Sequence, residues 1–187
     1  MQRYFIEQSF DNELATITGD DAKHITRVMR MTAGERIIVV SENIAHICEI
    51  VDLEQDVIVK QTGETIASPE MPHNVTIACG LPKGDKLELI TQKGTELGMY
   101  ELVPFAAERS VVKWDDKKGK KNAERLQKIA KEAAEQSHRT HIPSIQMPIS
   151  FKQLLARVAD FDVVFIADEE DAKAEMRTRF EIGRAHV

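Results

Sequence analysis

The residues best placed to do chemistry follow three apolar runs in the second half of the sequence. Lys83 and Lys86 come after the first run, Arg109 after the second, and Asp168 and Glu169 after the third. Each run has the length of a buried strand, and ligands of open α/β sheets bind beyond the carboxyl ends of the strands. Cations and backbone N–H groups at the first two ends suit a phosphate group or the polar edge of a base. The spacing therefore predicts a polar ligand site along one edge of a sheet.

Familiar catalytic and metal-binding motifs do not occur in the sequence. Cys48 and Cys79 stand alone in apolar runs, and the six histidines are scattered. The segment Lys83-Gly84-Asp85-Lys86 lacks the leading glycine of a P-loop, and no GxGxxG sequence follows a predicted strand. We therefore expect packed thiols rather than a disulfide, no metal site, and no nucleotide site of either familiar kind.

Charge is unevenly distributed along a chain of 187 residues whose net charge is −6. Residues 1–72 carry 6 lysines and arginines against 13 acidic residues, whereas residues 109–131 carry nine against three. Such a basic run is either the solvated face of a loop and helix or a surface that binds phosphate groups. The sequence leaves both interpretations open. No apolar run is long enough to span a membrane, and no signal peptide precedes the first strand, so we expect a cytoplasmic protein.

The first 70 residues are predicted to form short strands with one helix among them. The strand-like runs are 36–40, 45–51 and 56–60. Short strands at this spacing are typical of a small barrel or sandwich. Asp20 or Asp21 is placed to cap the helix. Its predicted buried face consists of Ala22, Ile25, Val28 and Met29, and its exposed face of Lys23, Arg27 and Arg30.

Residues 62–72 show no periodicity and contain several Gly, Ser and Pro residues, which is typical of a boundary between domains. We place the domains at 1–70 and 71–187. Beyond the boundary, strands are predicted at 75–79, 102–105 and 163–167, and helices at 85–97, 122–137 and 151–159. This alternation predicts a parallel sheet covered by helices on both faces, the α/β class.

Several of these segments together resemble one known family. They are Leu81-Pro82-Lys83-Gly84-Asp85-Lys86, then Glu88 and Gln92-Lys93, Thr95-Glu96-Leu97-Gly98, Glu108-Arg109-Ser110, and Glu132-Ala133-Ala134-Glu135-Gln136-Ser137 with Arg139. In combination they closely resemble the bacterial 16S ribosomal RNA uridine N3-methyltransferases of the SPOUT superfamily, which use S-adenosylmethionine and act on uridine 1498. The early residues His24, Arg27, Val28 and Arg30 resemble the PUA-like RNA-binding domain of the same family.

The resemblance implies an N-terminal PUA-like β-barrel followed by an α/β trefoil-knot methyltransferase domain, normally in a homodimer. It implies S-adenosylmethionine as cofactor and the 16S rRNA of the small ribosomal subunit as partner, with no membrane and no metal. Loss of the N3 proton leaves negative charge on the uracil oxygens, and Arg109 and Arg139 are our candidates to stabilise it. The candidates for RNA contacts are Lys23, His24, Arg27, Arg30, Lys83 and Lys86.

The sequence departs from the family pattern in three places. Lys23 stands where the family often has a second histidine. Gly94 stands where the family commonly has alanine within a helix, which costs about 1 kcal/mol in helix propensity. The Gly-Pro-Glu-Gly-Gly and Leu-Arg segments that close the knot around the cofactor are absent, and residues 181–187 resemble a translated sequencing adapter. We therefore expect a methyltransferase domain without its knot-closing segment, in which Asp168 and Glu169 are the remaining candidates for cofactor contacts. The alternative function is a catalytically incompetent RNA-binding fragment of the enzyme.

Overall fold

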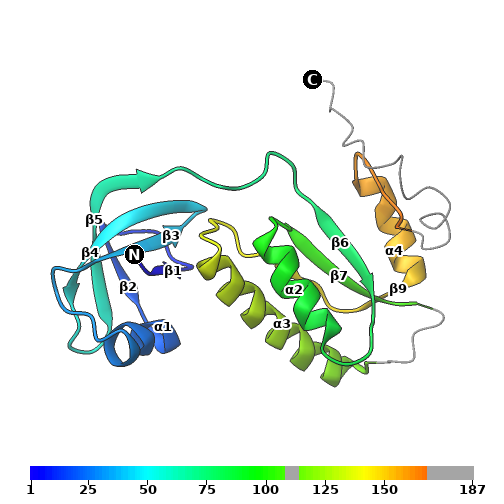
Figure 1. The fold of residues 1–187 in the computed structure, drawn as a ribbon, viewed down its shortest axis with the longest axis horizontal. Helices are drawn as coiled ribbons and strands as arrows, with labels where there is room; N and C mark the ends of the chain where they lie inside the picture. Colours follow the sequence, from blue (N-terminus) through cyan, green and yellow to red (C-terminus); the bar gives the residue numbers. More distant parts are fainter. Residues whose placement is uncertain (108–113, 168–187) are drawn as a thin grey trace. The chain divides into compact units, whose positions relative to one another are not determined.

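The structure is a computed structural model that describes residues 1–107 and 114–167. The chain divides into two compact units, residues 1–151 and 152–187. Figure 1 shows the first unit beginning with a curved sheet and continuing into a second sheet, against which two helices pack. None of the helices within the described ranges is long and apolar enough to cross a membrane.

Five strands form the first sheet, in the order β1-β3-β4-β5-β2. They are β1 (Arg3–Phe5), β2 (Leu14–Ile17), β3 (Arg36–Ser41), β4 (Ile44–Asp52) and β5 (Val57–Ile66). β1 pairs with β3 in parallel, and the other neighbours are antiparallel. Alternate side chains such as Ile37, Val39 and Ile50 point into one fully buried core, as the period of two predicts. Cys48 belongs to this core as a free thiol, and burial raises its pKa to about 12.

The predicted helix starts as α1 (Gly19–Lys23) and continues directly as a π-helical turn, η1 (His24–Val28). Its predicted buried face is only half correct, because Ala22 and Ile25 are buried whereas Val28 and Met29 are 67% and 39% exposed. The backbone N–H of Met29 bonds to the carbonyl of His24 five residues earlier, at 2.8 Å. This wider turn moves the later apolar residues off the face that a period of 3.6 assigns to them.

Residues 62–66, expected to belong to an irregular boundary, lie in β5. Thr65 and Ile66 pair with His46 and Ala45 of β4, beyond a register shift between His46 and Cys48. Such a shift breaks the strict alternation along both strands, which is why the segment shows no strand periodicity in the sequence.

The second sheet consists of parallel strands centred on β7, and this confirms the predicted parallel α/β arrangement for the described strands. They are β6 (Thr76–Gly80), β7 (Glu101–Ala106), β8 (Ser144–Ile145) and β9 (Ile149–Ser150), each of the other three pairing with β7. β6 lies at an edge of this sheet and Ala78 is exposed, so the strand is less buried than its composition predicts.

Helices α2 (Lys86–Glu96) and α3 (Asp116–Gln136) lie side by side against this sheet (Figure 1). α3 begins six residues before its predicted start, because the side chain of Asp115 accepts a hydrogen bond from the backbone N–H of Lys118 at 2.7 Å. A Cβ atom at Gly94 would lie 3.0 Å from Sδ of the buried Met99, which explains a glycine in the middle of α2. Leu87, Leu102 and Leu126 complete the core between helices and sheet.

In the second unit, the predicted helix at 151–159 is present as α4 (Phe151–Arg157) followed by the 3-10 turn η2 (Val158–Asp160). The predicted strand at 163–167 is wrong: these residues form no strand in the described structure, and Phe165 and Ile166 are about nine-tenths exposed. A strand needs the backbone hydrogen bonds of a neighbouring strand, and no described residue pairs with this segment.

Candidate functional site

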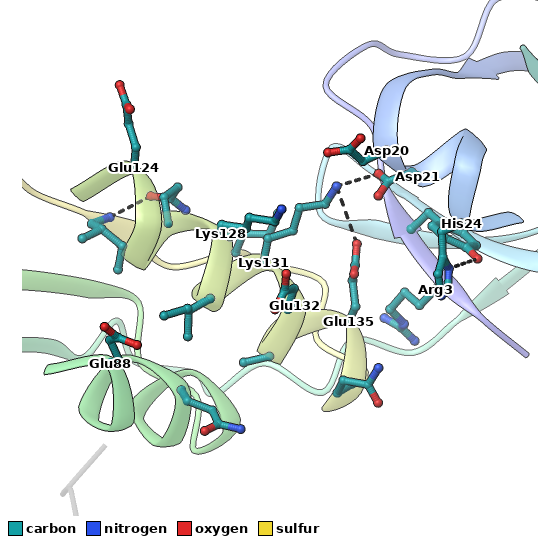
Figure 2. A pocket seen from close by; sticks show the side chains of 18 of the residues that line it. Arg3, Asp20, Asp21, His24, Glu88, Glu124, Lys128, Lys131, Glu132 and Glu135 are labelled. Atoms are coloured by element: carbon teal, nitrogen blue, oxygen red, sulfur yellow. Dashed lines mark hydrogen bonds and ion pairs between the residues drawn. The ribbon is translucent and has the colours of Figure 1, made fainter. Parts of the chain in front are cut away.

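The candidate site is a groove of about 1930 Å³ between the α1–η1 segment and the helices α2 and α3 (Figure 2). Three of the predicted RNA-contacting residues line it: Lys23, His24 and Arg27. The opposite wall carries residues of the family-like segments, namely Glu88, Gln92 and Glu96 of α2 and Glu132, Glu135 and Gln136 of α3. The groove therefore brings together two sets of residues that are at least 60 positions apart in the sequence.

The opposite wall is built from residues that are four positions apart along each helix. Glu88, Gln92 and Glu96 are four residues apart, so they share one face of α2. Lys128 and Glu132 share a face of α3 in the same way. Arg125 of α3 pairs with Glu88 at 2.9 Å and so joins the two helices at this wall.

An ion-pair cluster joins α3 to α1 across the groove, and Figure 2 shows its members pointing toward one another. Nζ of Lys131 lies 2.5 Å from Oδ2 of Asp21 and 3.7 Å from Oε1 of Glu135. Burial raises the pKa of Glu135 to about 7, although Lys131 acts in the opposite direction. Glu135 therefore holds its proton to a higher pH than an exposed glutamate does.

His24 is held at the groove by Tyr4 of β1. The Tyr4 hydroxyl lies 2.9 Å from Nδ1 of His24, and the two rings meet edge-on with centroids 5.9 Å apart. Burial raises the pKa of Tyr4 to about 12, with smaller contributions from Asp21 and Glu135, so the hydroxyl keeps its proton and its hydrogen bond with Nδ1 orients the imidazole ring.

The predicted basic residues of the α1–η1 segment differ in how they are presented. Lys23 is exposed and pairs with Asp20 at 3.1 Å. Arg27 and Arg30 are exposed and form no ion pair with any described residue. Arg30 lies outside the groove lining, at a left-handed turn with φ 53°. Unpaired guanidinium groups at the surface are available for backbone phosphates.

Acidic side chains outnumber basic ones along the groove as a whole. Asp20, Asp21 and Asp85 lie on its walls together with the glutamates of α2 and α3. Phosphate groups are repelled by such an excess of negative charge. The groove therefore does not offer a continuous track for an RNA backbone, and its exposed cations lie in separate places, Arg27 on the α1–η1 wall and Lys120 and Lys128 on α3.

The predicted meeting of strand ends is confirmed for β6 and β7. Their parallel register sets Gly80 opposite Phe105, so both carboxyl ends reach the same edge of the sheet. Lys83 and Lys86, which follow β6, are exposed beside this edge. Gly84 lies between them at φ 65°, a conformation that lets the chain turn into α2.

The structure places one of the two predicted catalytic arginines in a buried network. Arg139 is 4% exposed, and its Nε and Nη2 atoms contact the carboxylate of Glu70. Its Nη1 atom donates to the carbonyls of Thr95 and Met99, at 3.2 and 2.6 Å. The carbonyl of Arg139 in turn accepts from Nη1 of Arg3 at 2.7 Å. These contacts favour a structural role for Arg139.

Glu70 and Arg3 are the partners that the sequence gives no means to find. Glu70 stands in the irregular segment before β6, and its carboxylate also accepts from the backbone N–H groups of Thr140 and His141. Burial opposes the charge of Glu70, but the hydrogen bonds from Arg139, Thr140 and His141 lower its pKa overall. A single acidic residue next to a proline has no periodicity that could indicate such a partner.

The remaining predicted site residues lie outside the described residues: Arg109, the other proposed catalytic arginine, and the proposed cofactor contacts Asp168 and Glu169. No group of three or more His, Cys, Asp or Glu side chains suited to a metal ion occurs in the ranges that the structure describes.

Comparison with known proteins identifies both parts of the chain. Residues 17–60 match a family described as the RNA methyltransferase PUA domain, and residues 69–184 match the RNA methyltransferase domain. Over 182 residues the chain is 49% identical to ribosomal RNA small subunit methyltransferase E of Bacillus subtilis, covering 92% of this chain and 70% of the relative. The predicted order of a PUA-like domain followed by a methyltransferase domain is thus confirmed.

Solved structures that share this fold include one without an assigned function and one bound to S-adenosyl methionine. One, described only as a hypothetical protein, is 49% identical with a TM-score of 0.85, and the match covers 90% of this chain and 71% of that one. The ribosomal RNA small subunit methyltransferase E of Neisseria gonorrhoeae, solved bound to S-adenosyl methionine, is 25% identical with a TM-score of 0.76. That match covers 84% of this chain and 66% of the Neisseria chain.

Proposed function

Because the chain belongs to the family of ribosomal RNA small subunit methyltransferase E, we propose that it methylates N3 of uridine 1498 in 16S rRNA, with S-adenosylmethionine as methyl donor. The observation that carries the proposal is the groove, where Lys23, His24 and Arg27 of the PUA-like domain face the family-like segments of α2 and α3. An enzyme that modifies one base needs this combination, because RNA contacts must position the base at the catalytic domain.

The cofactor site that fits this chain is the carboxyl edge of β6 and β7. Ligands of open α/β sheets bind at this edge, and the register of Gly80 with Phe105 brings both strand ends to it. S-adenosylmethionine bound there supplies an electrophilic methyl group. We assign Asp168 and Glu169 to its contacts as part of this proposal.

The task of the protein side chains is to hold the uridine and to favour the form of uracil that has lost its N3 proton. The negative charge of that form is spread over the carbonyl oxygens, so a guanidinium group aimed at them stabilises it. We propose Arg109 for this role and Lys83 and Lys86 for contacts with phosphate or base. Arg139 is the second candidate, and its buried contacts with Glu70 weigh against it.

A calorimetric titration tests the cofactor half of the proposal. Saturable binding of S-adenosylmethionine to the full chain, with transfer of a labelled methyl group to 16S rRNA in small ribosomal subunits, would support the proposed enzyme and contradict the expectation that the domain lacks the segment that closes around the cofactor. S-adenosylhomocysteine, which lacks the methyl group, is the control that binds without transfer. A chain that binds RNA but neither binds nor uses S-adenosylmethionine would support the RNA-binding fragment and contradict the proposed enzyme.

The salt dependence of RNA binding tests the other half. We expect Arg27→Gln/Arg30→Gln to weaken binding and to reduce the slope of log K against log salt by about 0.7 for each phosphate group that is no longer neutralised. The matched control is Arg36→Gln/Lys60→Gln, which removes the same charge from exposed residues of the same domain that pair with Glu64 and Glu13. Equal slopes for the two double variants would exclude the α1–η1 segment as the RNA-binding surface.

A further inference from the structure

A second, smaller pocket of about 250 Å³ lies in the first unit, and none of its lining residues also lines the groove. Four segments form it: the turn between β3 and β4, residues 68–74, the turn after α2, and the loop after α3. The residues that matter for its chemistry are Tyr100, His141, Asn43 and Asn74. No role proposed above uses any of these four residues.

Two stacked rings form one wall of this pocket. Tyr100 and His141 have ring centroids 4.4 Å apart and planes within 2° of each other. Nε2 of His141 lies 3.2 Å from the carbonyl oxygen of Tyr100, so it is the atom that carries the proton and donates. Nδ1 is then left as an acceptor. Tyr100 is 39% exposed despite its size, which leaves part of the ring available for a further planar group.

The pocket has a floor that is already ordered. The Glu70–Arg139 ion pair lies beneath it, and the hydroxyl groups of Ser68 and Thr140 bond to each other at 3.0 Å. Because Arg139 neutralises Glu70, the floor does not present an uncompensated negative charge. A ligand that enters does not have to order these residues first.

The polar groups at the rim are unoccupied. Asn43 and Asn74 are exposed, and within the described part of the chain neither side-chain amide has a hydrogen-bond partner. Each side-chain amide offers hydrogen-bond donors and an acceptor, and the edge of a nucleobase offers the same two kinds of group. Together with Nδ1 of His141, the pocket combines a stacking surface with groups that read a base edge.

We infer that this pocket binds one unstacked base of a single-stranded RNA segment, which stacks on the Tyr100–His141 pair. The inference rests on the proposed function, which supplies RNA as the partner. Proteins bind splayed-out bases of single-stranded RNA in this way, by stacking on aromatic side chains and by hydrogen bonds to the base edges. Asn74 and Tyr100 precede β6 and β7, so the pocket lies at the amino ends of the two strands, whereas the proposed methyl transfer takes place at their carboxyl edge. This base is therefore a different one from the base that is methylated.

Binding of a fluorescently labelled, single-stranded 16S rRNA fragment to the full chain tests the inference. We expect Tyr100→Ala to weaken binding by about 5- to 100-fold, the effect of losing one stacked base. Tyr100→Phe is the matched control, because it keeps the ring and should retain wild-type affinity. Stacking involves no counterion release, so Tyr100→Ala should leave the salt slope unchanged, unlike Arg27→Gln/Arg30→Gln.

Crosslinking of the wild-type chain provides a readout that does not depend on a variant folding correctly. An RNA that carries 4-thiouridine should crosslink to the peptides that contain Tyr100 or His141. The inference would be overturned if Tyr100→Ala bound RNA with wild-type affinity, or if the crosslinks avoided both peptides. In either case, salt-dependent binding through Arg27 and Arg30 would still support the proposed function. A wild-type chain that binds no RNA would overturn both.

Discussion

At the scale of single residues, the partners of a charged side chain decide its role. Arg139 and Arg27 carry the same guanidinium group, but Arg139 is buried against Glu70 and two carbonyls whereas Arg27 is exposed and unpaired with any described residue. The first arrangement fixes backbone segments to one another. The second leaves the charge free for a ligand.

The buried pair predicts a large effect of Glu70→Gln on stability. The substitution leaves the charge of Arg139 without its counterion in a site that is 4% exposed, so we expect a loss of about 3 kcal/mol in the free energy of unfolding. Glu64→Gln is the matched control, because Glu64 is exposed and pairs with Arg36 only at 3.8 Å. The control should change stability by less than about 1 kcal/mol in the same urea titration. Equal effects of the two variants would contradict the structural role of Arg139.

Glu135 predicts a pH-dependent change in stability. Its folded pKa of about 7 lies above the ordinary value of 4.5, so the protonated form favours folding. This contribution is fully present below about pH 4.5 and is lost as the pH rises through about 7. Glu135→Gln mimics the protonated form. We expect it to match the wild type at pH 4.5 and to be more stable by on the order of 2 kcal/mol at pH 8.

Thermal unfolding across this pH range measures the difference, and Glu132→Gln is the control on the same helix. Glu132 is exposed, so its variant should follow the wild-type profile. A Glu135→Gln profile parallel to that of the wild type from pH 4.5 to 8 would contradict the buried position of this carboxylate beside Lys131 and Asp21.

At the scale of elements, the two long helices differ in how their first turns are capped. The side chain of Asp115 accepts a hydrogen bond from Lys118 at the start of α3, whereas Asp85 occupies the corresponding position of α2 without a side-chain cap bond. We expect Asp115→Ala to cost about 1 kcal/mol and Asp85→Ala clearly less, by chemical denaturation. The reverse order would show that α3 does not begin at this residue.

Strands and helices whose own residues carry a recognisable pattern were predictable from the sequence, and those that depend on distant partners were not. Strand β4 follows from the alternation of its own residues and β3 from its run of β-branched residues, and helix α2 was also predicted from its own segment. The π-helical turn at His24–Val28 has the composition of an ordinary helix, so its wider period leaves no signal in the sequence. The apolar run at 163–167 has the composition of a strand but forms none in the described structure. A strand also needs a neighbouring strand to pair with, and composition does not show whether there is one.

At the scale of the whole molecule, the candidate site was predictable in its parts but not in its assembly. The family-like segments and the basic residues of the α1–η1 segment were each identified from the sequence. Their meeting in one groove depends on contacts such as Lys131 with Asp21, which are 110 residues apart. No local pattern encodes such a contact, and the same holds for the stacking of Tyr100 on His141.

The proposed cofactor site lies in the methyltransferase domain alone, and this predicts which backbone amides change their rate of hydrogen exchange when the cofactor binds. If S-adenosylmethionine binds at the carboxyl edge of β6 and β7, backbone amides of residues 80–86 and 102–106 should exchange more slowly when it is added. Amides of β3, β4 and β5 should be unaffected, because these strands form a separate core around Ile37, Val39 and Ile50. Mass spectrometry of the exchanged peptides, with S-adenosylhomocysteine as a second ligand, measures both regions in one experiment. Protection confined to the N-terminal sheet would move the cofactor site away from β6 and β7, and with it the proposed roles of Lys83 and Lys86.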